Sequence, residues 1–270
     1  YKRQIPDSFG LGVEFIEKEG PVFRNPISKS IDIKNLNHFD PESLDYVYKA
    51  VNNIKSSLPE EIPLIGFCGS PWTLAAYSIE GRSSKDFEKT LGFLESNQKD
   101  VHDLLTKYTD ACFLYLRKQV QSGADVIQIF DSWANLLTKE DLIEFSFNYI
   151  NSLISALKLD PVTKNIPVII FARNPKCNIE ELITTSADCI SLFWSMNDLN
   201  FEVAKNKVAI QGNLDPKILL ESDETIKRET YKILERFKEY PGYIFNLGHG
   251  ITPDISPDKI KYLTNIVREY

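Results

Sequence analysis

The sequence contains only four cysteines, and no two of them are close together. Cys68, Cys112, Cys177 and Cys189 form no C-x-x-C pair. Disulfide frameworks and structural zinc sites place cysteines at short, regular spacings. We therefore predict reduced, mostly buried thiols and no metal site.

Long apolar runs and basic clusters are also missing. The longest apolar stretches, such as residues 168–172, are far shorter than the roughly 18 residues of a membrane-spanning helix. No charged and then apolar leader opens the chain. The net charge is −7, and no basic cluster is interleaved with aromatic residues. These absences predict a cytoplasmic protein that binds neither a membrane nor nucleic acid.

Methionine is almost absent, since Met196 is the only one and the chain begins with Tyr1. A natural chain begins with methionine. We therefore expect a further segment of unknown length before Tyr1.

Apolar and helical segments alternate along most of the 270 residues. The first forty residues are rich in turns, with one short strand expected at 30–33. A helix is expected to begin at Asp40 or Pro41. Six buried strands are then predicted at 62–68, 125–130, 167–172, 188–193, 208–211 and 242–247. Helices are predicted at 71–80, 85–122, 139–159, 178–184, 197–206, 216–240 and 257–269.

Continuous apolar strands separated by helices are typical of a parallel sheet that is buried on both faces. No Gly-rich dinucleotide fingerprint follows any strand, which disfavours an open doubly wound sheet. The length suits a barrel, which needs about 250 residues. We predict a single α/β domain over residues 1–270, a (β/α)8 TIM-type barrel that is incomplete at its N-terminus. Its first strand is expected to be absent or to lie in the loop-rich beginning.

Polar, aromatic and glycine residues gather where the predicted strands end. These segments are 67–72, 130–133, 171–174, 193–195, 211–215 and 246–250. The active sites of such barrels lie at the carboxyl ends of the strands. This distribution predicts an enzyme. His249 is the strongest single candidate for a functional residue, because glycines on both sides let the backbone approach a ligand. His38 and His102 have no such setting, and we expect ordinary structural roles for them.

Four other residues, three at strand ends and Tyr77 on the helix after the first predicted strand, have two interpretations each. Ser132 suits a hydroxyl that binds substrate, or a helix N-cap. Asp131 could be a cap or a buried salt-bridge partner, and Tyr77 could face the barrel mouth or pack in the core. Arg173 could bind an anion, although pairing with a neighbouring loop carboxylate is slightly favoured. The glycines at 212, 248 and 250 also suit a phosphate site, so an enzyme acting on a phosphorylated metabolite is an alternative.

Several long motifs, in order, resemble the uroporphyrinogen decarboxylase family. They are LIGFCGSPWTL at 64–74 with Tyr77 and Glu80-Gly81 after it, GAD at 123–125, FDS at 130–132, QGNLDP at 211–216 and NLGHG at 246–250. The stretch at 5–12 fits the same family, so the resemblance runs essentially from end to end.

The resemblance implies a lyase of haem and tetrapyrrole biosynthesis that needs no metal or organic cofactor. It would convert uroporphyrinogen III to coproporphyrinogen III by removing the carboxyl groups of four acetate side chains. A pyrrole ring that is protonated beside the acetate can accept the electron pair that carbon dioxide leaves behind. The family also implies a homodimer.

Residue by residue, Tyr77, Ser132 and His249 match the family's substrate-contacting tyrosine, hydroxyl residue and histidine. Tyr77 is the catalytic candidate, and Phe67 and Phe130 are expected to form apolar walls. The family's arginine-rich loop and essential aspartate would precede Tyr1, so we expect the 270-residue chain alone to be inactive.

Two competing functions remain open at this point. A related zinc-dependent methyltransferase would need a close set of histidine and cysteine ligands, but His249 is followed by Gly250 and Ile251. A non-catalytic tetrapyrrole-binding protein is the other alternative.

Overall fold

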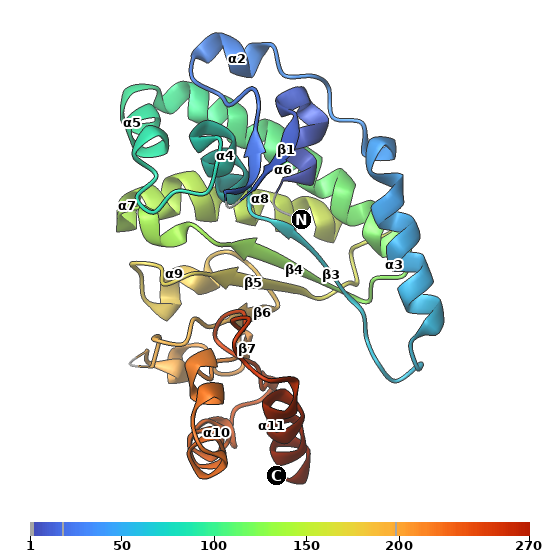
Figure 1. The fold of residues 1–270 in the computed structure, drawn as a ribbon, viewed down its shortest axis with the longest axis vertical. Helices are drawn as coiled ribbons and strands as arrows, with labels where there is room; N and C mark the ends of the chain where they lie inside the picture. Colours follow the sequence, from blue (N-terminus) through green and yellow to red (C-terminus); the bar gives the residue numbers. More distant parts are fainter. Residues whose placement is uncertain (1–2, 18, 198) are drawn as a thin grey trace.

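A curved parallel sheet with helices around it dominates the computed structural model (Figure 1). The structure describes residues 3–17, 19–197 and 199–270. Six strands form this sheet: β3 (Ile65–Gly69), β4 (Val126–Asp131), β5 (Val168–Ala172), β6 (Cys189–Ser191), β7 (Ala209–Gln211) and β8 (Tyr243–Ile244). The main helices are α3 (Asp45–Ser57), α4 (Pro71–Glu80), α5 (Glu88–Ser96), α6 (Gln98–Gln121), α7 (Lys139–Leu142), α8 (Asn148–Leu159), α9 (Ile179–Ile183), α10 (Asp223–Phe237) and α11 (Pro257–Glu269).

The strands lie in the sheet in their order along the chain, from β3 to β8, and every neighbouring pair is parallel. A doubly wound sheet would reverse its order at a switch point. A sequential order is that of a barrel, so the predicted barrel-type α/β fold is confirmed. The described strands leave β3 and β8 as the two edges, and an eight-stranded barrel would place two more strands between them.

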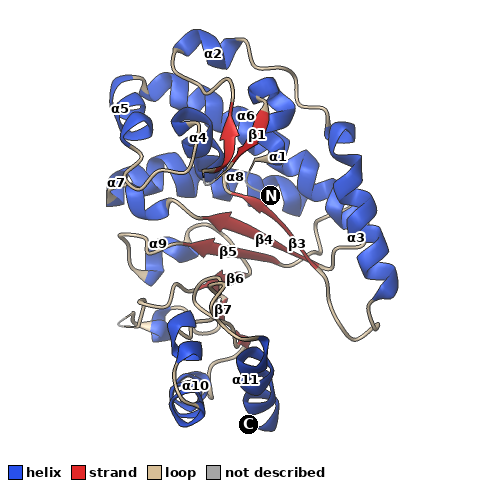
Figure 2. Ribbon diagram, in the orientation of Figure 1, coloured by secondary structure: helices blue, strands red, loops and turns tan. Residues whose placement is uncertain are grey.

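Helices cover the outer face of the sheet, as Figure 2 shows. Helices α4, α6 and α8 pack against one another and contribute buried side chains such as Trp72, Tyr108 and Leu153 to the core. A second apolar cluster lies between α10 and α11, around Ile226 and Leu263. No helix in the described residues is long and apolar enough to cross a membrane. Cys68, Cys112 and Cys189 are buried, as predicted, and Cys177 is partly exposed.

Helix α4 begins and ends where the sequence predicts. The Ser70 hydroxyl accepts a hydrogen bond from Thr73 N at 3.0 Å, and Pro71 occupies the first helical position. Both features are common at helix N-termini. Gly81 ends the helix in a left-handed conformation, φ +82°, and its N–H bonds to Tyr77 O. Likewise, Asp40 caps a 3-10 turn at Pro41–Leu44 that runs directly into α3.

The prediction for the first forty residues is wrong in two places. Residues 30–33 belong to a short helix, α2 (Ser30–Lys34), because the Asp32 carboxylate accepts N–H bonds from Ser28 and Lys29 and turns the chain. The antiparallel hairpin of β1 (Val13–Ile16) and β2 (Gly20–Phe23) was not predicted. It follows a helical segment that comprises α1 (Gln4–Pro6) and one π-helical turn, and it joins no strand of the main sheet.

Several predicted elements are shorter or divided. The helical region 85–122 is two helices that meet at Asn97, and 139–159 contains a π-helical turn at Ile143–Phe147 between α7 and α8. A 3-10 turn at Pro216–Leu220 precedes α10. The predicted strand at 242–247 is regular only at Tyr243–Ile244, and Leu247 adds an isolated parallel bridge to Leu214. The predicted helix at 197–206 includes residue 198, which lies outside the described residues, and the remainder holds only a 3-10 turn at Phe201–Val203.

The Gln119 side chain from α6 serves as a partner for the outer edge of β3. Its amide nitrogen donates to Phe67 O and its amide oxygen accepts from Phe67 N, both at 3.0 Å. Gly66 makes this approach possible, because a Cβ at that position would lie 2.9 Å from the Gln119 amide oxygen. Gln119 thus supplies both a donor and an acceptor to the backbone of an edge strand.

We expect Gln119→Leu to lower the free energy of unfolding by about 1–3 kcal/mol, because it removes both hydrogen bonds from the Gln119 amide to the Phe67 backbone. Urea denaturation of the full-length protein measures this. Gln121→Leu, on the exposed side of the same helix, is the control and should change the value by less than about 0.5 kcal/mol. An equal loss in both variants would contradict the role given to Gln119.

Candidate active site

The carboxyl ends of the strands surround a cavity of about 440 Å³. The register aligns Phe130 on β4 with Phe171 on β5, and Phe171 with Ser191 on β6, so these side chains point to the same face of the sheet. The cavity is lined by Gln128, Phe130, Ser132, Phe171, Ser191, Asn246, Leu247, His249, Gly250 and Ile251. Apolar rings therefore alternate with amide and hydroxyl groups around its wall.

Three of the predicted site residues, Phe130, Ser132 and His249, line this one cavity. A fourth, Phe67, packs its ring edge-on against Phe130 with centroids 6.0 Å apart. Phe67 is 38% exposed although it lies in a strand, because it faces the open side of the described sheet. The fold thus brings together four residues that are up to 182 positions apart in the sequence, as expected for a site at the strand ends.

His249 stands against two aromatic rings. Its ring centroid lies 6.3 Å from that of Phe171 and 5.9 Å from that of Phe193. Gly248, before it, donates its N–H to Leu214 O at 2.8 Å, and a Cβ at Gly248 would lie 2.4 Å from Trp194 N. Only glycine allows this approach, and the approach fixes the backbone from which His249 projects.

Asp131 is a buried acceptor of three hydroxyl hydrogen bonds. Ser70 and Thr73 from α4 donate to one carboxylate oxygen at 3.0 Å, and Ser146 donates to the other at 2.5 Å. Burial raises the pKa of Asp131, and the hydroxyls of Ser146, Ser70 and Thr73 oppose that shift. The salt-bridge reading is wrong for Asp131 among the described residues, since its partners are hydroxyls.

Ser132 is held by its backbone. Its N–H donates to the Thr73 hydroxyl at 2.9 Å, and its side chain lines the cavity. The next helical turn, Ala134–Leu136, has Trp133 at its N-cap position and no side-chain cap. The N-cap reading of Ser132 is therefore wrong, and its hydroxyl is left facing the cavity.

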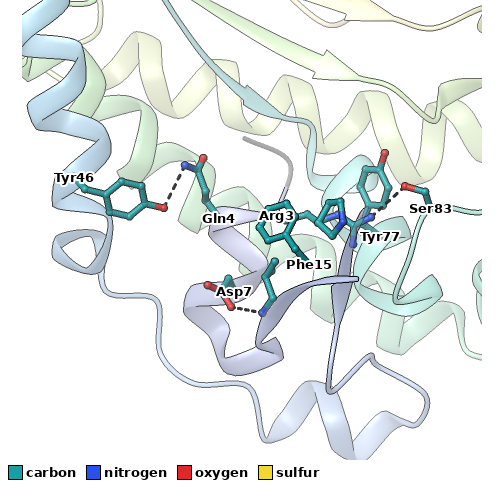
Figure 3. Close-up of a pocket in the computed structure, with 9 residues that line it drawn as sticks. Arg3, Gln4, Asp7, Phe15, Tyr46, Tyr77 and Ser83 are labelled. Atoms are coloured by element: carbon teal, nitrogen blue, oxygen red, sulfur yellow. Dashed lines mark hydrogen bonds between the residues drawn. The ribbon is translucent and has the colours of Figure 1, made fainter. Parts of the chain in front are cut away.

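Tyr77 lines a second cavity, of about 590 Å³, beside the N-terminal hairpin (Figure 3). Its ring packs edge-on against Trp133 at 5.6 Å and Phe87 at 5.9 Å, and the Arg3 guanidinium lies 4.6 Å from the ring centroid. Burial raises the pKa of Tyr77, while Trp133, Arg3 and Arg173 lower it. The structure thus places Tyr77 on a different cavity from that of Ser132 and His249 and does not bring all three into one space.

Arg173 lies over the Trp133 ring, 5.5 Å from its centroid. No ion pair among the described residues includes Arg173, so the favoured pairing with a loop carboxylate is wrong. His102 is hydrogen-bonded to Tyr149 at 2.7 Å and to Glu144 at 3.2 Å on the outer helices, which agrees with a structural role. His38 is exposed in the loop after α2.

Two alternatives from the sequence lose support. The Asn213 amide, in the proposed phosphate loop, donates to Phe193 O at 3.1 Å and to Asn197 Oδ1 at 3.2 Å, and Gly248 packs on Trp194. These groups are engaged within the protein and do not form an anion cradle. The His, Cys, Asp and Glu side chains of the described residues also form no group of three that could hold the zinc of a methyltransferase.

The profile of one protein family, described as "Uroporphyrinogen decarboxylase (URO-D)", matches residues 3–270. The chain belongs to this family. It is 42% identical over 268 residues to the uroporphyrinogen decarboxylase of Vesicomyosocius okutanii and 41% identical over 268 residues to that of Pseudoalteromonas atlantica. Each alignment covers 98% of this chain and 76% of the relative.

A methyltransferase from Methanosarcina mazei is similar in structure, with a TM-score of 0.72. It is 17% identical, and the alignment covers 99% of this chain and 77% of that protein. At this identity the likeness supports the fold alone. The uroporphyrinogen decarboxylase family, by contrast, identifies the chain as a carboxy-lyase of tetrapyrrole biosynthesis, as the motifs predict.

Sequence reasoning missed several residues at the site of this decarboxylase. Gln128 could have been found, because it precedes Phe130 by two positions on one strand and so shares its face. Ser191 depends on the register between β5 and β6, which the sequence does not specify. Arg3 and Trp133 reach Tyr77 only through the tertiary fold.

Asp131→Asn should reveal the raised pKa of Asp131 in the pH dependence of stability. The folded protein binds the Asp131 proton more tightly than the unfolded chain, whose aspartates titrate at about 3.9. Asp131 therefore contributes stability below that pH, which is lost as the pH rises through its raised folded pKa. We expect the wild type to lose stability relative to Asp131→Asn as the pH rises from the unfolded pKa through the raised folded pKa. Urea denaturation at a series of pH values measures this.

Asp125→Asn is the matched control for the pH series. Bonds from Leu64 N and Lys55 Nζ lower the pKa of Asp125. The wild type should therefore gain stability relative to Asp125→Asn as the pH rises through the lowered folded pKa toward the unfolded value. Slopes of the same sign in both comparisons would contradict the assignment.

Gly248→Ala should lower the free energy of unfolding by about 1–3 kcal/mol, because the new methyl group overlaps Trp194. Gly250→Ala is the comparison, since nothing lies within 4 Å of a Cβ there. Thermal or urea unfolding of the full-length variants measures both. Equal stabilities would show that Trp194 can move away at no cost.

Proposed function

We propose that this chain removes the acetate carboxyl groups of uroporphyrinogen III, giving coproporphyrinogen III without a metal or organic cofactor. The observation that carries the proposal is the match to one family over residues 3–270, with its motif residues Phe130, Ser132 and His249 on one cavity. The alternative, a non-catalytic tetrapyrrole binder, has no separate observation in its favour.

The reaction needs a place for the electron pair of the breaking bond. A proton adds to the pyrrole carbon beside the acetate-bearing carbon and makes the ring an electron acceptor. The bond between the acetate methylene and its carboxylate then breaks, and its electron pair moves into the ring as carbon dioxide leaves. A proton on the methylene and loss of the ring proton give a methyl group, so each cycle consumes one proton in total.

The cavity supplies groups for binding such a substrate. Phe67 and Phe130 present apolar faces to a macrocycle, and Ser132 and His249 offer polar atoms at the same wall. The hydroxyl of Tyr77, whose pKa is raised, keeps its proton and can donate a hydrogen bond. Asp131 is not assigned the role of the charge-stabilising carboxylate, because its oxygens are occupied by Ser70, Thr73 and Ser146 and it lines neither cavity.

Three further features belong to the same proposal. The protein acts in the cytoplasm, it assembles as a homodimer, and residues 1–270 form one domain. The expectation that these residues need a preceding segment for activity also stands as a proposal. Light scattering of the full-length protein tests the dimer.

We expect the full-length protein to convert uroporphyrinogen III anaerobically to products with progressively fewer carboxyl groups, from eight to four. Separation of the oxidised porphyrins by carboxyl number measures this. Tyr77→Ala and His249→Ala should each lower the rate by about 100-fold or more, because each removes a polar group aimed at the reacting substrate.

His38→Ala, which changes an exposed histidine outside both cavities, should retain the wild-type rate. Circular dichroism establishes that each variant is folded. A folded full-length protein that binds uroporphyrin but releases no carbon dioxide would favour the tetrapyrrole binder and refute the enzyme.

A further inference from the structure

The Arg3 side chain is buried without a counter-ion in the described part of the chain. The residue is 8% exposed, and no Asp or Glu oxygen of the described residues lies within ion-pair distance of it. Its Nη2 donates to the Ser83 hydroxyl at 3.3 Å, and its Nη1 is buried with no hydrogen-bond partner. Buried charges in proteins are normally paired, so this arrangement calls for an explanation.

Neighbouring aromatic rings pack against the guanidinium but cannot accept hydrogen bonds from all of its N–H groups. It lies 4.6 Å from the ring centroid of Tyr77 on α4 and 5.2 Å from that of Phe23 on β2. Such contacts favour the cation, yet they provide no acceptor for its N–H groups. The backbone is fixed as well, because Asp7 N donates to Arg3 O at 2.8 Å. Arg3 is thus preorganised, with donor capacity to spare.

The guanidinium forms part of the wall of the 590 Å³ cavity, together with Tyr77 and Ser83 (Figure 3). Asp7 also lines this cavity, but its carboxylate accepts from Val13 N at 2.7 Å and makes no ion pair with Arg3. Arg173, which lies over the Trp133 ring, adds positive potential at Tyr77. The Arg3 end of the cavity is therefore suited to an anion.

We propose that Arg3, Tyr77 and Ser83 form a subsite that binds one carboxylate of the substrate. A carboxylate offers two acceptor oxygens to the N–H fork of an arginine, and the two hydroxyls can donate to the same group. The proposal rests on the proposed function for the identity of that substrate, a polycarboxylate macrocycle.

The bound carboxylate is one that stays on the substrate. An arginine paired with the departing carboxylate would stabilise the charged ground state more than the transition state, in which that charge is lost. Arg3 is accordingly a specificity-determining residue that contributes to binding. Its removal should raise KM and leave kcat nearly unchanged.

The test compares variants of the full-length protein. Arg3→Met should raise KM for uroporphyrinogen III by about tenfold and keep kcat within about twofold of wild type. Arg3→Lys, which retains the charge but not the fork, should show a smaller rise in KM. The control is Arg24→Met, because Arg24 is exposed beside the same hairpin and pairs with Glu14 at 2.9 Å; its KM should equal that of wild type.

A purely structural role for Arg3 predicts a different result. If Arg3 serves the subsite, replacing this unpaired buried cation by methionine should leave the unfolding midpoint of the ligand-free protein unchanged or raise it. If Arg3 is purely structural, the same replacement should lower the midpoint. A lowered midpoint with an unchanged KM, or a wild-type KM in folded Arg3→Met, overturns the subsite. If Arg3→Met does not fold, Ser83→Ala and Arg3→Lys decide the question, and a wild-type KM in both overturns it.

Binding of uroporphyrin, followed by fluorescence quenching, separates the subsite from the proposed function. Binding that weakens about tenfold in Arg3→Met but not in Arg24→Met supports the subsite even if the wild type shows no turnover. Normal turnover by wild type, with equal uroporphyrin affinity in the wild type and both variants, overturns the subsite and leaves the decarboxylase intact.

Discussion

The buried carboxylate of Asp131 connects the parts that build the active site. It lies at the end of β4 and takes hydroxyl bonds from Ser70 and Thr73 at the start of α4 and from Ser146 in the turn before α8. One group therefore fixes a strand end, a helix start and a second helical segment relative to one another. Because burial alone would make this carboxylate costly, the three hydroxyls are a condition for placing it there. These bonds hold the start of α4, the helix that carries Tyr77.

The same anchor determines how the two cavities are related. Thr73 accepts the N–H of Ser132, and Tyr77 follows Thr73 by one helical turn. Ser132 thus faces the cavity at the strand ends, whereas Tyr77 faces the cavity under the hairpin, and the Trp133 ring contacts Tyr77, Phe87 and Arg173 between them. A large macrocycle with carboxylates on its rim could contact both regions, with its rings on Phe67 and Phe130. The separation of the two cavities is therefore compatible with a single substrate.

The parts that could be predicted from sequence are those set by local pattern. The strands are short, mainly apolar segments, and α4 has a serine cap, a proline start and a glycine end, so the predicted bounds of these elements are accurate to a few residues. The hairpin β1–β2 could not be predicted, because the side chains of Val13–Ile16 are half-buried or exposed and show no apolar run, and its two strands pair only with each other. Phe130, Ser132 and His249 followed from the strand-end rule, which is a property of the fold. Arg3 could not be found, since its burial arises from contact with Phe23 and Tyr77, which are distant in sequence.

The net charge of the protein has the same sign as the charge of the proposed substrate. The chain carries a net charge of −7, so its overall field opposes an approaching polyanion. Donors that act at short range in a buried site can overcome that field, because a charge removed from water interacts more strongly with its partner. Asp131, at the end of β4, is buried and bonded to hydroxyls, while Arg3 lies over the Tyr77 ring and Arg173 over the Trp133 ring. The described residues that line the strand-end cavity include no Asp or Glu, and Asp7, on the wall of the second cavity, accepts a hydrogen bond from Val13 N. Positive charge lies beside Tyr77, and this is the local arrangement that an acidic protein needs in order to bind an acidic substrate.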